Sequence, residues 1–176
     1  MGSTERIKNV AKRVAKWARA GHQMVVVPSA MSGETNRLLG LAKELSLNSP
    51  GDTHSRELDA LAATGEQASS ALLAIALQAE GMASVSYAGW QVAIQTNSAH
   101  TKARIESIDD KKVRSDLDAG KVVIITGFQG VDGAGNITTL GRGGSDTSAV
   151  AIAAALKAHE CLIYTDNLFT DFYLSN

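Results

Sequence analysis

Three polar loops hold the side chains that could carry chemistry. The first, residues 29–35, offers hydroxyl groups at Ser29, Ser32 and Thr35 beside a glycine, Gly33. Glycine lets backbone N–H groups approach a ligand closely. The same residues also suit an ordinary connection between a strand and a helix, with the hydroxyls as caps. The sequence leaves both interpretations open.

The second loop combines residues 127–130 with residues 138–147 and is rich in glycine. Glycines beside a helix N-terminus form a concave surface of N–H donors, and the helix dipole favours an anion there. Arg142 adds a planar fork that suits a carboxylate or phosphate. Neither the Walker loop nor the dinucleotide fingerprint is present, because the first needs Gly-Lys-Ser/Thr and the second needs glycine at Asp146. The pattern favours an anion site over a simple glycine-rich turn.

The third loop, residues 64–67, is predicted to begin an apolar helix that carries Glu66. A carboxylate in a first helical turn commonly complements the helix dipole. Alternatively, Glu66 could hold a substrate ammonium group while Arg142 holds the substrate carboxylate. That combination would select an amino acid.

Other catalytic patterns are missing from the sequence. The four histidines, His22, His54, His100 and His159, show no metal-ligand spacing, and neither His-Glu-x-x-His nor Gly-x-Ser-x-Gly occurs. These observations argue against zinc sites and serine hydrolases, and no protein-bound metal site is predicted. Trp17 is predicted to lie in the core, whereas Trp90 suits a loop or a pocket wall equally well.

Helices and strands alternate along the chain and would position these loops. Hydrophobic periodicity predicts helices over residues 5–20 (capped by Thr4), 38–45, 56–63, 66–80, 110–119 and from Ser145 or Asp146 to 158. Apolar or β-branched runs predict strands over residues 23–27, 84–87, 103–108, 121–126 and 161–164, with a hairpin turn at 132–136. This order predicts an α/β fold with a three-layer, doubly wound and mostly parallel sheet. Ligands of such sheets bind beyond the carboxyl ends of the strands.

Composition excludes several classes of protein. With 17 basic and 18 acidic side chains in 176 residues, the chain has no cationic excess for binding nucleic acid. Its single cysteine, Cys161, cannot form an internal disulfide and fits the cytoplasm. The N-terminus lacks the apolar segment of a signal peptide, and no apolar run approaches the ~20 residues that span a bilayer, so no membrane association is expected.

Both ends of the sequence are unusual for this pattern. The first helix is of the kind that normally crosses over between two parallel strands, which predicts a further strand upstream. Residues 167–176 show no clear period and predict no element.

Five segments together closely resemble bacterial aspartokinases, and the similarity runs from residue 3 to residue 166. They are 25–36 (VVVPSAMSGETN), 64–66 (TGE), 89–91 (GWQ), 127–130 (GFQG) and 139–146 (TLGRGGSD). The resemblance implies the amino acid kinase fold and transfer of the γ-phosphoryl group of ATP, with Mg²⁺, to the side-chain carboxylate of L-aspartate. The product, 4-phospho-L-aspartate, opens the route to lysine, threonine and methionine.

The resemblance also implies roles for individual residues. Arg142 would bind the substrate carboxylate and Glu66 its amino group, with further contacts from Ser29 and Thr35. Asp146 would organise the catalytic centre. Thr165 and Asp166 would begin the nucleotide-binding segment.

The chain departs from the family at both ends. Aspartokinases begin with a strand that ends in Lys-x-Gly-Gly-Thr/Ser-Ser, and they continue beyond the position of Asp166 into nucleotide-binding segments and paired regulatory ACT modules. The resemblance therefore implies that residues 1–166 form the aspartate-binding half of an incomplete catalytic domain and that residues 167–176 form a divergent tail without ACT modules. The parent enzyme is expected to be a homo-oligomer, and the isolated chain to be nearly inactive.

Two alternatives remain open. The chain could be a non-catalytic fragment that binds aspartate or pairs with another subunit through an exposed sheet edge. It could also belong to another amino acid kinase, such as acetylglutamate or uridylate kinase, although the loops at 29–36 and around Arg142 fit those enzymes less well.

Overall fold

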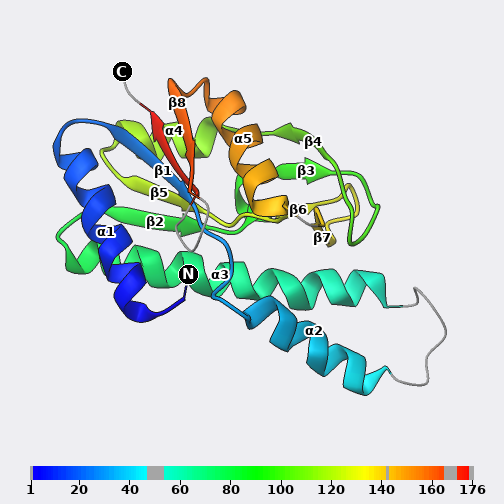
Figure 1. Cartoon of the computed structure of the whole chain (residues 1–176). Coiled ribbons are helices and arrows are strands. Elements are labelled where there is room, and N and C mark those ends of the chain that lie inside the picture. The colour runs from blue at the N-terminus through cyan, green and yellow to red at the C-terminus, as the bar shows by residue number, and fades with distance from the viewer. Residues whose placement is uncertain (1, 47–53, 142, 165–169, 175–176) are drawn as a thin grey trace.

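A five-stranded sheet forms the centre of the molecule (Figure 1). The computed structural model describes residues 2–46, 54–141, 143–164 and, for the backbone, 170–174. The strand order is β2 (Ser84–Tyr87), β5 (Val122–Ile125), β1 (Gln23–Val27), β9 (Thr170–Leu174) and β8 (Glu160–Ile163). The first three strands are parallel, whereas β9 runs antiparallel to both of its neighbours. The predicted mostly parallel sheet is therefore confirmed.

Helices cover both faces of this sheet and make the three predicted layers (Figure 1). Helix α1 (Thr4–Arg19) and helix α3 (Ser55–Ala79) cover one face, whereas α4 (Lys111–Asp118) and α5 (Gly144–Leu156) cover the other. Along β1, Met24 and Val26 pack toward α1 and α3, whereas Val25 and Val27 pack toward α4 and α5. Burial on both faces explains why these strands are apolar at nearly every position.

Two expectations for the first helix are wrong. Ser3, not Thr4, caps α1, because its side chain accepts a hydrogen bond from the Arg6 N–H at 3.3 Å. Trp17 is 41% exposed and packs edge-on against His22 instead of entering the core. The core face of α1 carries smaller side chains, including those of Val10, Ala11 and Val14.

A second sheet has four strands, of which the sequence predicts only one, at residues 103–108. Its order is β4 (Ile105–Ile108), β3 (Ile94–Thr96), β6 (Gln129–Val131) and β7 (Ile137–Thr139), and a short helical turn, η1 (Gly89–Val92), precedes β3. Three of these strands have only three residues, which is too short to show a hydrophobic period. The hairpin turn predicted at 132–136 is present between β6 and β7 and is held by Asp132, which accepts from the N–H groups of Ala134 and Asn136.

Helices α2 (Glu34–Leu45) and α3 lie side by side (Figure 1), and α3 packs against strands β2, β5 and β7. The two helices predicted at 56–63 and 66–80 are one continuous helix, α3, that passes through Gly65. A Cβ atom at Gly65 would lie 3.0 Å from the Ala30 Cβ, so glycine lets α3 approach the loop after β1. This close contact explains why a glycine lies in the middle of the helix.

Of the helices described, α3 alone is long and apolar enough to cross a membrane, and half of the segment that meets this criterion is buried inside the fold. The buried side chains of α3 include Leu73 and Leu77, which pack against α1 and the central sheet. This burial is typical of a core helix.

Two further differences concern the later part of the chain. Helix α5 is capped by Gly143, and neither Ser145 nor Asp146 is its cap. The segment 170–174, for which the sequence predicts no element, forms β9. Because β9 pairs with β1, it occupies one edge of that strand, and β5 occupies the other.

Two glycines of the β6–β7 hairpin should respond differently to alanine. A Cβ atom at Gly130 would lie 2.6 Å from the Ile94 carbonyl oxygen and 2.5 Å from Thr96 Cγ2, whereas a Cβ atom at Gly133 would meet nothing within 4 Å. We expect Gly130→Ala to lower the free energy of unfolding by about 2 kcal/mol, since overpacking forces the backbone to shift. Gly133→Ala, the control, should change it by less than about 0.5 kcal/mol. Equal effects in urea denaturation would contradict the close packing of β6 against β3.

Candidate functional site

A cavity of about 770 Å³ opens where β1 and β5 end. Its walls come from the loop after β1, helices α2 and α3, the loop that contains Thr101, and the segment from β7 to the start of α5. The lining residues are Ser29, Thr35, Asn36, Leu39, Leu58, Asp59, Ala62, Glu66, Thr101, Phe128, Thr139, Gly141, Gly143, Gly144, Ser145 and Asp146. The cavity therefore lies at the carboxyl edge of the parallel strands, as expected for this class of sheet.

Four residues that the sequence singles out line this one cavity. They are Ser29, Thr35, Glu66 and Asp146, and they come from three separate parts of the chain. Three other candidates, Arg142, Thr165 and Asp166, lie outside the described residues. The fold thus brings together the three polar segments that the sequence identifies.

The N-terminal ends of two helices face the cavity. Thr35 and Asn36 belong to the first turn of α2, and Gly144, Ser145 and Asp146 belong to the first turn of α5. A glycine in the left-handed conformation precedes each helix. The positive ends of the helix dipoles and their N–H groups make this side of the cavity suitable for an anion.

Close glycine contacts fix the start of α5 against the loop after β5. A Cβ atom at Gly127 would lie 2.9 Å from the Ser145 Cα, and one at Gly144 would lie 2.6 Å from Phe128 Cδ2. The Ser148 hydroxyl also accepts a hydrogen bond from the Phe128 N–H at 3.0 Å. The glycines of this region therefore position the helix end, a structural role that is additional to any ligand contact.

Glu66 lies in the middle of α3 with 4% of its surface exposed. Its Oε1 accepts a hydrogen bond from the Ala30 N–H at 3.4 Å, whereas its buried Oε2 has no partner among the described residues. Burial raises the pKa of this carboxyl group from 4.5 to about 7, and hydrogen bonds from backbone N–H groups offset only part of the shift.

The position of Glu66 along α3 decides between its two interpretations. The helix begins at Ser55, so Glu66 lies about three turns from its N-terminus. The effect of the helix dipole is confined to the first turn. The interpretation of Glu66 as a partner of that dipole is therefore wrong, and a role toward a ligand in the cavity remains.

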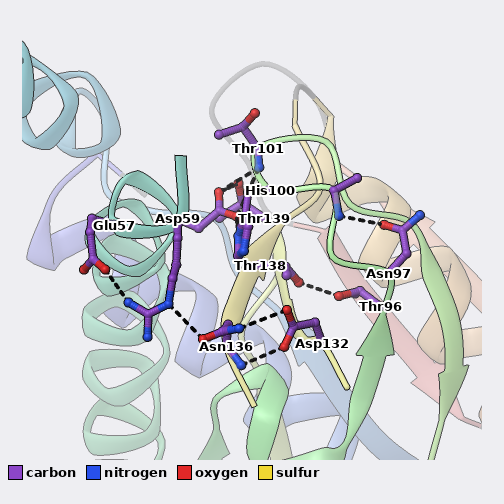
Figure 2. A network of polar contacts seen from close by, with 12 residues as sticks. Glu57, Asp59, Thr96, Asn97, His100, Thr101, Asp132, Asn136, Thr138 and Thr139 are labelled. Atoms are coloured by element: carbon purple, nitrogen blue, oxygen red, sulfur yellow. Dashed lines mark hydrogen bonds and ion pairs between the residues drawn. The ribbon is translucent and has the colours of Figure 1, made fainter. Parts of the chain in front are cut away.

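Asp59 is a further polar residue of the cavity wall, which the sequence analysis missed. It is 1% exposed and accepts hydrogen bonds from the Thr101 N–H and the Thr139 hydroxyl, and it also pairs with the His100 ring (Figure 2). The available signal was its spacing, because Asp59 lies seven residues before Glu66 and therefore shares its helix face. Its partners, however, are 41 to 80 residues away in the sequence.

Trp90 lies away from this cavity. It is half-exposed in η1 and lines a separate groove with Gln67, Gln95 and the turn after β6. Within the part of the chain that the structure describes, no group of three or more His, Cys, Asp or Glu side chains is placed to hold a metal ion.

Comparisons with known proteins agree on one family. Residues 1–167 match the amino acid kinase family. The chain is 62% identical over 168 residues to an aspartate kinase of Pseudomonas fluorescens, covering 94% of this chain and 40% of that protein. The crystal structure of aspartate kinase from Synechocystis superposes with a TM-score of 0.76 at 44% identity, covering 94% of this chain and 26% of that one.

A more distant structure shares the fold. Aspartokinase III of E. coli, solved in complex with aspartate and ADP, superposes with a TM-score of 0.70 at 23% identity, over 90% of this chain and 46% of that one. The present chain spans about 40% of the length of the aspartate kinase of Pseudomonas fluorescens.

Removing the charge of Glu66 should stabilise the ligand-free protein at high pH. The native carboxyl group has a pKa of about 7, against an ordinary value of 4.5, so the native state loses stability as the pH rises from 4.5 to 7. At 1.36 kcal/mol per pH unit, we expect Glu66→Gln to raise the free energy of unfolding by up to roughly 3 kcal/mol at pH 8. The difference should vanish near pH 4.

Urea denaturation at several pH values checks this expectation. The control is Glu44→Gln, which changes an exposed carboxylate on α2. It should alter the free energy of unfolding by less than about 0.5 kcal/mol at any pH. A Glu66→Gln protein that is less stable than wild type at pH 8 would contradict the claim that the buried charge of Glu66 destabilises the native state.

Proposed function

Because the chain belongs to the amino acid kinase family, we propose that its cavity binds L-aspartate for phosphorylation of the side-chain carboxylate by ATP. The product would be 4-phospho-L-aspartate, the first intermediate toward lysine, threonine and methionine. The 62% identity to an aspartate kinase supports this substrate. The single structural observation that carries the proposal is the buried, half-partnered carboxylate of Glu66 in a cavity that two helix N-termini also line.

Opposite charges in the cavity suit an amino acid zwitterion. Glu66 would accept hydrogen bonds from the substrate ammonium group, which would compensate the cost of burying its charge. The N-terminal turns of α2 and α5 would receive the carboxylates. Ser29 and Thr35 would add hydroxyl contacts, and Arg142, by its place in the sequence beside the start of α5, would bind the α-carboxylate.

Phosphoryl transfer depends on positioning and on stabilising spread negative charge. ATP would supply the γ-phosphoryl group, with Mg²⁺ bound to its phosphates. The first turn of α5 fits an anion through its backbone N–H groups, and Asp146 in that turn would organise the centre. Thr165 and Asp166 are proposed, from the sequence alone, to begin the nucleotide-binding segment.

The buried carboxylate also argues against one alternative. In an acetylglutamate kinase the substrate nitrogen is acylated and carries no positive charge. Glu66 would then have no cation to pair with, and the cost of burying its charge would remain. The cavity therefore favours a substrate with a free ammonium group.

Other features of the protein follow as proposals from the same family membership. We infer that residues 1–166 contribute an aspartate-binding part of a catalytic domain and that residues 167–176, which include β9, form a divergent C-terminal segment. A cytoplasmic location and assembly into a homo-oligomer are inferred as well. A fragment that binds aspartate without catalysis is the second candidate, and it requires the same cavity.

Calorimetric titration with L-aspartate tests the proposed substrate site. We expect binding to the wild-type chain at pH 8 and at least about tenfold weaker binding to Glu66→Gln and to Arg142→Ala, since each loses a charged partner of the substrate. N-acetyl-L-glutamate should not bind. Circular dichroism establishes that each variant is folded.

Glu44→Gln serves as the matched control and should bind aspartate as the wild type does. Absence of binding by a folded wild-type chain would overturn the proposed site. Unchanged affinity in Glu66→Gln would remove Glu66 from it.

A further inference from the structure

We propose that Asp59 is a positioning residue that holds the wall of the aspartate cavity formed by Thr101 and Gly141. The inference rests on the proposed function, because it assigns the wall to aspartate binding. It concerns a residue that would act through its neighbours, without contact to the substrate.

Four hydrogen-bond contacts converge on the Asp59 carboxylate (Figure 2). The Thr101 N–H lies 3.0 Å from both oxygens, the Thr139 hydroxyl donates to Oδ1 at 2.5 Å, and His100 Nδ1 lies 2.8 Å from Oδ2. These partners occupy both oxygens of a side chain that is 1% exposed. The carboxylate therefore joins α3 to the loop at 100–101 and to β7.

Thr101 has an unusual backbone conformation. Its φ of 66° lies in the left-handed region, which a β-branched residue adopts only at a cost. Such conformations persist where the surrounding structure holds them, and they concentrate at functional sites. Here the holding contact is the carboxylate of Asp59 on the Thr101 N–H.

The carbonyl group of Thr101 lies close to Gly141, the other residue of this wall. A Cβ atom at Gly141 would lie 3.1 Å from the Thr101 oxygen, and Gly141 itself has a φ of 80°. The Ala103 N–H also donates to the Thr139 carbonyl at 2.9 Å. A shift of Thr101 would thus move the backbone beside Gly141, and both residues line the cavity.

One helix thereby controls two parts of the cavity. Asp59 and Glu66 are seven residues apart on α3, which is about two turns, so both lie on the same face. Glu66 would bind the substrate, whereas Asp59 would fix the wall at the right distance from it.

Two variants of Asp59 test the proposal. Asp59→Ala removes every contact, whereas Asp59→Asn keeps one acceptor for the Thr101 N–H and nearly the same volume. We expect aspartate to bind about tenfold or more weakly to Asp59→Ala, with Asp59→Asn between it and wild type. Hydrogen exchange should speed up at residues 99–103, 139–141 and 143–145 in both variants, and this readout needs no ligand.

Asp132→Ala is the matched control. Asp132 is also a buried carboxylate, 3% exposed, but it holds the β6–β7 turn and does not line the aspartate cavity. Its replacement should lower the melting temperature and leave the dissociation constant for aspartate within about twofold. If lower stability alone weakened aspartate binding, Asp132→Ala would also bind aspartate more weakly.

The outcomes separate the two proposals. Weaker binding with faster exchange, in either folded Asp59 variant, supports the inference. Unchanged exchange, or wild-type affinity in the folded variants, overturns it while leaving the proposed function intact. A folded wild-type chain that binds no aspartate overturns the proposed function, and with it the assignment of this wall to aspartate binding.

Discussion

The burial of the Glu66 carboxylate is the interaction on which the rest of the site depends. A charge in an apolar helix is costly unless a partner compensates it, and here only one oxygen has a partner among the described residues. The pKa of about 7 expresses that cost. The remainder of the fold, with α3 packed against both sheets and the loop after β1, holds the carboxylate where a cation could reach it.

The arrangement of the elements gives the cavity its two kinds of wall. Parallel strands β1 and β5 end at the same edge of the central sheet, so the loops that follow them meet there. Helices α2 and α5 start at the cavity with their positive ends, and α3 contributes carboxylates to the same cavity. Close contacts at Gly65, Gly127 and Gly144 allow this convergence, since a side chain at any of them would press on a neighbour.

The sequence predicts the parts of this structure that local patterns determine. The apolar runs of β1 and β5 and the period of α1 identify those elements directly. Gly65 leads to the wrong prediction of two separate helices, because this glycine allows a tertiary contact with Ala30 and does not end a helix. The three-residue strands of the second sheet are too short to show a hydrophobic period.

In the candidate site, too, local patterns predict some residues, whereas others depend on contacts between distant parts of the chain. Asp59 escapes prediction because its contacts join residues that only the fold brings together. The roles of Ser29, Thr35, Glu66 and Asp146 remain predictions, although all four residues line one cavity. The most direct measurement is the pKa of Glu66, determined by a pH titration that monitors the carboxyl carbon by NMR, with and without saturating L-aspartate. We predict a pKa of about 7 in the ligand-free protein and a fall of at least about one pH unit when the ammonium group binds, because an adjacent positive charge favours the ionised carboxylate. A ligand-free pKa near 4.5, or a value that bound aspartate leaves unchanged, would contradict the role of Glu66 as the partner of the substrate ammonium group.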